Sequence, residues 1–141
     1  MQGDPDAALR CFEQASALLP LGRDRSIVLR EIARLRADKG EVDVALQLHL
    51  ETLGVFEGLR DMRECAVTMS DIAHVRADKG DVDAALQLYQ EALAIVEGLA
   101  DRQSRAVTLG DIARLLAAKG DVDAALQLHQ EIERASCRER V

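Results

Sequence analysis

The sequence predicts an all-α protein, an α-solenoid of about seven helices stacked as antiparallel pairs. Three observations lead to this prediction. Residues 61–91 match residues 101–131 at 20 of 31 positions when the two segments are aligned at a shift of 40. Within each unit, apolar residues recur at the spacing of a helix face. Glycines near positions 3, 40, 80 and 120 separate the two helices of each unit, because glycine readily adopts the left-handed conformation that ends a helix.

Each helix follows from this pattern in chain order. In the last unit, Leu109, Ile112 and Leu116 form the apolar stripe of the helix before the glycine. The acidic residue after the glycine favours the next helix N-terminus, and because Asp is the better cap we expect Glu41 to act through the helix dipole. The helices are expected at residues 5–19, 25–38, 42–57, 62–78, 82–97, 102–118 and 122–133.

A second turn joins one unit to the next, as Gly58-Leu59-Arg60-Asp61 and again in residues 98–101. We expect Gly58 and Gly98 to follow the helix end in the left-handed conformation, with Asp61 capping the next helix. Glu64 lies three residues beyond Asp61, the spacing of a capping box. No single helix pair can enclose its own apolar face, so neighbouring units must supply the core.

Composition limits the classes of function. The chain has 18 Lys and Arg against 25 Asp and Glu, a net charge of −7, with 48% hydrophobic residues. That apolar fraction predicts a folded chain, and the negative charge disfavours binding to nucleic acid or anionic lipid. The sequence has no run of 18 apolar residues, so a membrane span is not expected. We expect a cytoplasmic protein with no nucleic-acid, membrane or cofactor partner.

The candidate chemical groups are scattered. Cys11, Cys65 and Cys137 are too far apart to indicate a disulfide framework or a zinc site. Cys11 aligns with leucines and is expected in the core, whereas Cys65 aligns with arginines and is expected at the surface. His49 and His129 lie two units apart, which predicts packed structural side chains and no metal site. The sequence shows no nucleophile grouped with a base, so an enzyme is not expected.

Positions counted from each glycine show a resemblance to a known family. A small residue stands five positions on, an aromatic residue or histidine nine positions on, and an Ile-Ala pair eight and seven positions before. These residues are Ala8, Ala45, Ala85 and Ala125; Phe12, His49, Tyr89 and His129; and Ile32-Ala33, Ile72-Ala73 and Ile112-Ala113. The chain thereby resembles the tetratricopeptide repeat family. Its 40-residue period is similar to the long repeats of bacterial signalling proteins and kinesin light chains.

The resemblance implies a non-catalytic scaffold for protein–protein interaction that holds a partner peptide or protein in a concave groove. The row of Arg34, His74 and Arg114 favours a peptide of some acidic character, unless these arginines only pair with neighbouring acids or solvate the face. One alternative is a regulatory or sensor arm of a larger bacterial signalling protein, such as a repeat-containing NTPase. Another is self-association through exposed end repeats. The family's concave positions correspond here to Arg30, Arg34, Asp38, Ser70, His74, Asp78 and Arg114.

The last unit departs abruptly from the repeat. Residues 132–140 share none of nine positions with residues 92–100, whereas 92–100 share four of nine with 52–60. Residues 134–141 also resemble the translation of a widely used sequencing adapter, so we expect them to be a non-native tail. The repeat array is therefore predicted to span residues 3–133 as a fragment of a longer array cut at both ends. Its parts are a half repeat at 3–22 and repeats at 23–60, 61–100 and 101–133.

Overall fold

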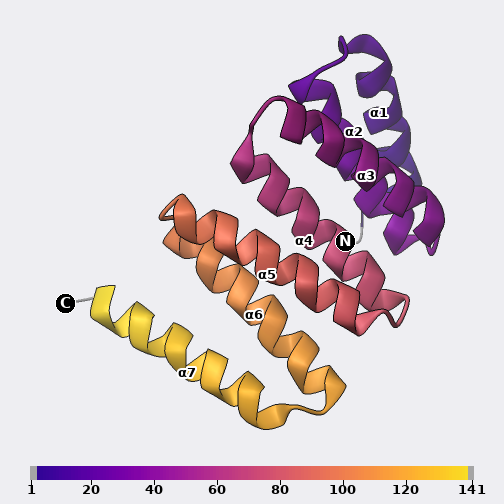
Figure 1. Ribbon diagram of the computed structural model, residues 1–141. Helices are drawn as coiled ribbons and strands as arrows, with labels where there is room; N and C mark the ends of the chain where they lie inside the picture. The colour runs from indigo at the N-terminus through magenta and orange to yellow at the C-terminus, as the bar shows by residue number, and fades with distance from the viewer. Residues whose placement is uncertain (1–2, 140–141) are drawn as a thin grey trace.

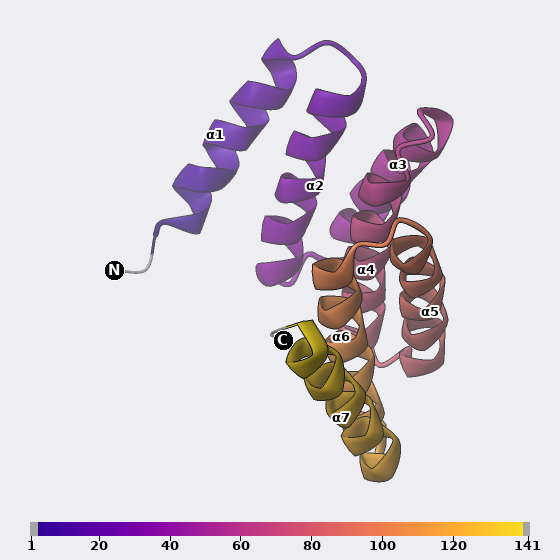
Figure 2. The same cartoon turned by 90° about the vertical axis from the view of Figure 1, so that its left-hand side faces the viewer.

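The computed structural model describes residues 3–139, and within them the chain forms helices joined by short turns. The helices follow one another in chain order from α1 at one end of the stack to α7 at the other (Figure 1). Turned by 90°, the stack places α3 and α5 to the right of α4 and α6 (Figure 2). The all-α solenoid is confirmed. The helices are α1 (Pro5–Leu18), α2 (Arg23–Asp38), α3 (Val42–Gly58), α4 (Met62–Asp78), α5 (Val82–Gly98), α6 (Arg102–Lys119) and α7 (Val122–Glu139).

The turn within each unit has the expected left-handed glycine. Gly40, Gly80 and Gly120 have φ angles of 86°, 90° and 98°. At the first of them, the N–H of Gly40 donates to the carbonyl of Ala37, and the N–H of Glu41 donates to the carbonyl of Arg36, both at 2.9 Å. These two bonds satisfy carbonyls that the end of α2 leaves free. The same pair of bonds closes α4 and α6.

The turn between units differs from our expectation. Gly58 and Gly98 are the last residues of α3 and α5, and the left-handed residues are Arg60 and Ala100, each with a φ of 54°. The N–H of Asp61 donates to the carbonyl of Phe56 at 3.0 Å, the closing bond that Glu41 makes after α2. That bond sets the left-handed position immediately before the aspartate. The prediction that Gly58 and Gly98 occupy it was wrong.

Some helix N-termini follow the capping rule and others do not: Gly22, Glu41 and Asp81 precede α2, α3 and α5 without a side-chain capping bond. The side chains of Asp61 and Asp101 accept hydrogen bonds from the N–H groups of Glu64 and Ser104 at 3.3 and 3.0 Å. Glu41 makes no capping bond with its side chain. It instead accepts a hydrogen bond from Nη1 of Arg36 at 2.7 Å. As expected, its carboxylate lies near the positive end of α3 without acting as a cap.

The core lies between successive helices, with no single centre. Alanines recur seven residues before and five residues after each turn glycine. They allow close helix packing and are almost fully buried. One such cluster joins Tyr89 of α5 with Ile112 and Leu115 of α6. Burial is therefore distributed along the stack, as expected for a solenoid. The buried small residues are Ala33, Ala73 and Ala113 before the turns and Ala45, Ala85 and Ala125 after them.

Ion pairs repeat with the helices. Nζ of Lys39 pairs with Asp6, that of Lys79 with Asp43 and that of Lys119 with Asp83, at 2.7 to 2.9 Å. Each pair joins the end of one helix to the start of the preceding one. Exposed pairs of this kind contribute at most about 1 kcal/mol, so they favour one register more than they stabilise the fold.

The last helix extends further than expected. We placed its end at residue 133, and α7 continues to Glu139. Residues 134–139 contain Ala, Arg and Glu, which are good helix formers. A cavity of about 620 Å³ lies between α6 and α7, and Ala106, Leu109 and Ile132 are among its lining residues. The division of the chain at residue 133 and the non-native origin of the tail stay predictions.

Candidate functional site

Two hollows lie side by side on the face formed by α2, α4 and α6, which we call the groove face. The first, the junction cavity, has a volume of about 320 Å³. The second, the outer cavity, has a volume of about 290 Å³. Asp111 of α6 lines both, so the two adjoin at this residue. Cavities of this volume suit single side chains of a partner better than a whole small ligand.

Five of the seven predicted groove residues line these hollows. Arg34 and Ser70 line the junction cavity. His74, Asp78 and Arg114 line the outer cavity. The other two, Arg30 and Asp38, lie elsewhere: Arg30 is buried, with 6% of its surface exposed, and Asp38 is exposed at the end of α2.

The basic side chains of the groove face already lie beside carboxylates. Arg34 donates to Glu31 at 2.6 Å and to Asp71 at 2.9 Å. Arg114 pairs with Asp111, three residues earlier on the same helix. His74 lies 3.6 Å from Asp78 through its Nε2 atom. These pairs reduce the attraction that the row of cationic side chains would offer to an acidic peptide.

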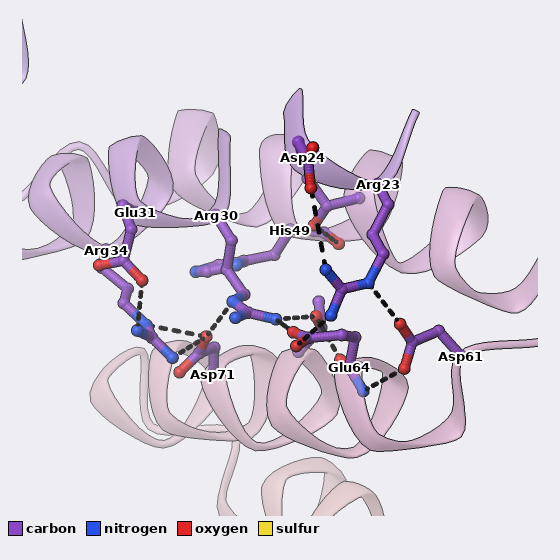
Figure 3. Close-up of polar contacts among 11 residues, drawn as sticks. Arg23, Asp24, Arg30, Glu31, Arg34, His49, Asp61, Glu64 and Asp71 are labelled. Atoms are coloured by element: carbon purple, nitrogen blue, oxygen red, sulfur yellow. Dashed lines mark hydrogen bonds and ion pairs between the residues drawn. The ribbon is translucent and has the colours of Figure 1, made fainter. Parts of the chain in front are cut away.

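A buried ion-pair cluster fills the junction between α2 and α4 (Figure 3). Nη1 of Arg30 donates to Glu64 at 2.5 Å and lies 3.4 Å from the hydroxyl of Thr68. The guanidinium also lies over the ring of Phe56, 5.6 Å from its centroid. At the edge of the cluster, Nε of Arg23 donates to Asp61 at 2.8 Å. Glu64 therefore bonds to Arg30 and does not close a capping box.

His49 lies behind this cluster on α3 with 1% of its surface exposed. Within residues 3–139, neither of its ring nitrogens has a hydrogen-bond partner. Burial, with a smaller effect of Arg34 and Arg30, lowers the pKa of His49 to about 4. The side chain is a neutral, packed histidine, as the sequence predicted for this position.

Burial also acts on the carboxylates of the groove face. It raises the pKa of Asp71 above its usual value, although Arg34 and Arg30 oppose the shift. It raises the pKa of Asp111 likewise, against the opposing charge of Arg114. A half-buried carboxylate of this kind is stabilised by any further cation brought into its cavity.

Three side chains lie differently from our expectations. Cys65 is 1% exposed, so its expected place at the surface was wrong; burial raises its pKa and makes the thiol unreactive. Cys11 is exposed, although its position corresponds to partly buried Leu48 and Leu88 of later units. Those leucines face the preceding unit, and no described helix precedes α1. His129 is exposed for the matching reason, since no described helix follows α7.

Sequence reasoning missed the second side of the junction cavity. Val96 of α5 and Ser104, Val107 and Thr108 of α6 all line it. A change between units could have indicated this cavity: at a shift of 40, the small Ser70 and Ser104 replace Arg30 and Glu64. Within residues 3–139, no group of three His, Cys, Asp or Glu residues could hold a metal ion. None of the described helices has the length and apolarity needed to span a bilayer.

Comparisons with known proteins agree with this architecture. A family model described as tetratricopeptide repeat matches residues 64–137. The kinesin light chain TPR-like repeats of Podosopora anserina superimpose with a TM-score of 0.77 at 20% identity, over 95% of this chain and 68% of theirs. BtubC (BKLC) from P. vanneervenii gives 0.84 at 20% identity, over 96% and 58%. MamA gives 0.68 at 13% identity, over 96% and 71%. No curated protein sequence matches significantly.

Proposed function

This chain belongs to the tetratricopeptide repeat family, and we propose that it is a non-catalytic scaffold that binds a partner protein or peptide along its groove face. Proteins of the family generally act by binding other proteins. The observation that carries the proposal is the pair of adjacent hollows that both have Asp111 in their lining. Five of the seven residues expected to contact a partner line them.

The form of the groove face supports an extended or helical segment as the ligand. The lining of the junction cavity includes the apolar residues Ala66, Val67 and Val107, and Val107 is 60% exposed. Polar and charged residues line the cavity too, among them Arg63 and Asp71. A partner that inserts one side chain into each hollow would bury apolar surface and keep its main chain along the helices.

A peptide library tests the proposal. Peptides captured by the chain are titrated into ¹⁵N-labelled protein, and we expect amide shifts to gather on α2, α4 and α6. Arg34→Glu together with Arg114→Glu should change the affinity of the captured peptides at least tenfold, downward for acidic peptides and upward for peptides that insert a cationic side chain. Arg105→Glu is the matched control, since Arg105 stands on α6 outside both hollows and pairs with Glu97. Binders that map to other surfaces, or that ignore the double variant, would contradict groove binding.

A further inference from the structure

The junction between α2 and α4 shows which side chain this architecture holds between successive units. Arg30 reaches out of α2 and is 6% exposed. Its guanidinium contacts Glu64 and Thr68 of α4, lies 3.9 Å from Asp71 of α4 and covers the ring of Phe56 on α3. Carboxylates, a hydroxyl and an aromatic face together form a socket suited to a planar cation.

The corresponding junction one unit later has no arginine and keeps only part of this socket: a hydroxyl and a carboxylate remain as Thr108 and Asp111, whereas the second carboxylate and the aromatic ring are replaced. At a shift of 40, the position of Arg30 is held by Ser70. The four residues that surround Arg30 correspond to Val96, Ser104, Thr108 and Asp111. All five of these residues line the junction cavity. The cavity is therefore the place of the missing guanidinium, opened because serine is too short to reach into it.

We propose that the junction cavity binds the guanidinium of an arginine side chain carried by the partner. This inference rests on the proposed function and names the chemistry that the groove face recognises. Asp111 is the main acceptor, because it lines the cavity and stands at the position of Asp71, although Arg114 already pairs with its Oδ1 atom. The hydroxyls of Ser104 and Thr108 add acceptors at the positions of Glu64 and Thr68.

Two arginines also line the cavity, and neither opposes a cationic ligand strongly. Arg63 pairs with Asp101 across the junction, and Arg34 pairs with Glu31 and Asp71. In the filled socket, Arg30 lies between Arg23 and Arg34, and each of these has its own carboxylate. The fold thus already holds one guanidinium between two paired arginines.

Short capped peptides test the inference directly. We would titrate ¹⁵N-labelled chain with acetyl-Gly-Arg-Gly-amide and with the same peptide carrying citrulline, a neutral relative of arginine with the same shape. Amide shifts are expected on α4 and α6 around Ser70 and residues 104–111. The citrulline peptide should bind at least tenfold more weakly, because it cannot form a charge-assisted bond with Asp111.

Variants separate the socket from the rest of the groove face. Asp111→Asn should weaken the arginine peptide at least tenfold. Asp78→Asn is the control, since it removes the same charge from the same face but lies outside the junction cavity. Ser70→Arg supplies a guanidinium from the chain itself and should abolish binding. Circular dichroism checks that each variant keeps the helix content of the parent.

Equal binding of the arginine and citrulline peptides would overturn the inference, as would an unaffected Asp111→Asn variant. Preference for a glutamate peptide at the same residues would also overturn it and would restore the acidic ligand that the sequence suggested. The proposed function fails separately. If library peptides still shift the amide signals of the groove face while the arginine peptide does not, only the inference of an arginine ligand is wrong. If library binders map elsewhere, groove binding itself is wrong.

Discussion

The turns between units predict that moving one glycine by two positions stabilises the protein. Ala100 has a left-handed φ of 54°, whereas Gly98 is the last residue of α5. A Cβ added at Gly98 meets no atom within 4 Å. The double variant Gly98→Ala with Ala100→Gly therefore places each residue type in the conformation that it prefers.

The size of the effect follows from the backbone. A left-handed L-residue costs about 1–2 kcal/mol, and glycine at position 100 returns about 0.4–1 kcal/mol through its greater freedom in the unfolded chain. The net gain there is about 0.5–1 kcal/mol. Alanine in place of Gly98 adds about 0.5–1 kcal/mol. The double variant should gain about 1–2 kcal/mol, or roughly 3–7 °C in Tm.

Urea unfolding followed by far-UV circular dichroism measures the difference at the transition midpoint. Gly80→Ala is the control, because Gly80 has a φ of 90° and a Cβ there also meets no atom within 4 Å. It should lose about 1 kcal/mol from the backbone conformation alone. If Ala100→Gly destabilises the chain while Gly80→Ala has no effect, the assignment of the left-handed positions is wrong.

Three further predictions concern buried groups. Arg30→Ala should cost about 3 kcal/mol because it removes the buried partner of Glu64 and leaves that carboxylate only the more distant Arg23, 3.5 Å away. Arg30→Ser with Glu64→Ser should cost less than the sum of the single variants in urea unfolding. His49 is neutral in the folded state, with a pKa of about 4, so its contribution is complete above the unfolded value of about 6.5 and is lost as pH falls toward 4. The variant His49→Tyr, which introduces the residue type found at Tyr89 one unit later, should remove up to about 3 kcal/mol of this acid sensitivity, measured as the change in stability between pH 7 and pH 4.5. Finally, iodoacetamide should label Cys11 and Cys137 in the native chain and label Cys65 only after unfolding, as mass spectrometry can show; rapid native labelling of Cys65 would contradict its burial.

The fold was predictable because its signal is repeated. Apolar spacing and the Lys-Gly turns fixed the order of the helices, and most helix ends agree within two residues. The errors arose where a local rule competes with geometry. Gly58 resembles a helix-ending glycine, yet the closing bond of Asp61 places Arg60 in the left-handed position. Glycine at 58 is simply tolerated at the end of α3.

The candidate site was only partly predictable, because alignment to a family gives the face of a helix and not the depth of a side chain. Arg30 belongs to the expected row of contacts, but it reaches down to Glu64 and Phe56 and is buried. Cys65 aligns with arginines and is buried as well, because a small side chain fits where an arginine must extend outward. The size of the side chain at one register, compared between units, indicates how deeply a residue is buried, which the residue type alone does not.

That comparison also explains why one junction is closed and the next is open. At the register of Arg30, the following units have Ser70 and then Gly110. The arginine fills the space between α2 and α4, and the serine leaves a cavity between α4 and α6. Restoring the pair with Ser70→Arg and Ser104→Glu should therefore rebuild the buried cluster and eliminate the cavity. A junction completed by its own chain has no place for the side chain of a partner, so in this protein cohesion between units and recognition compete for the same socket.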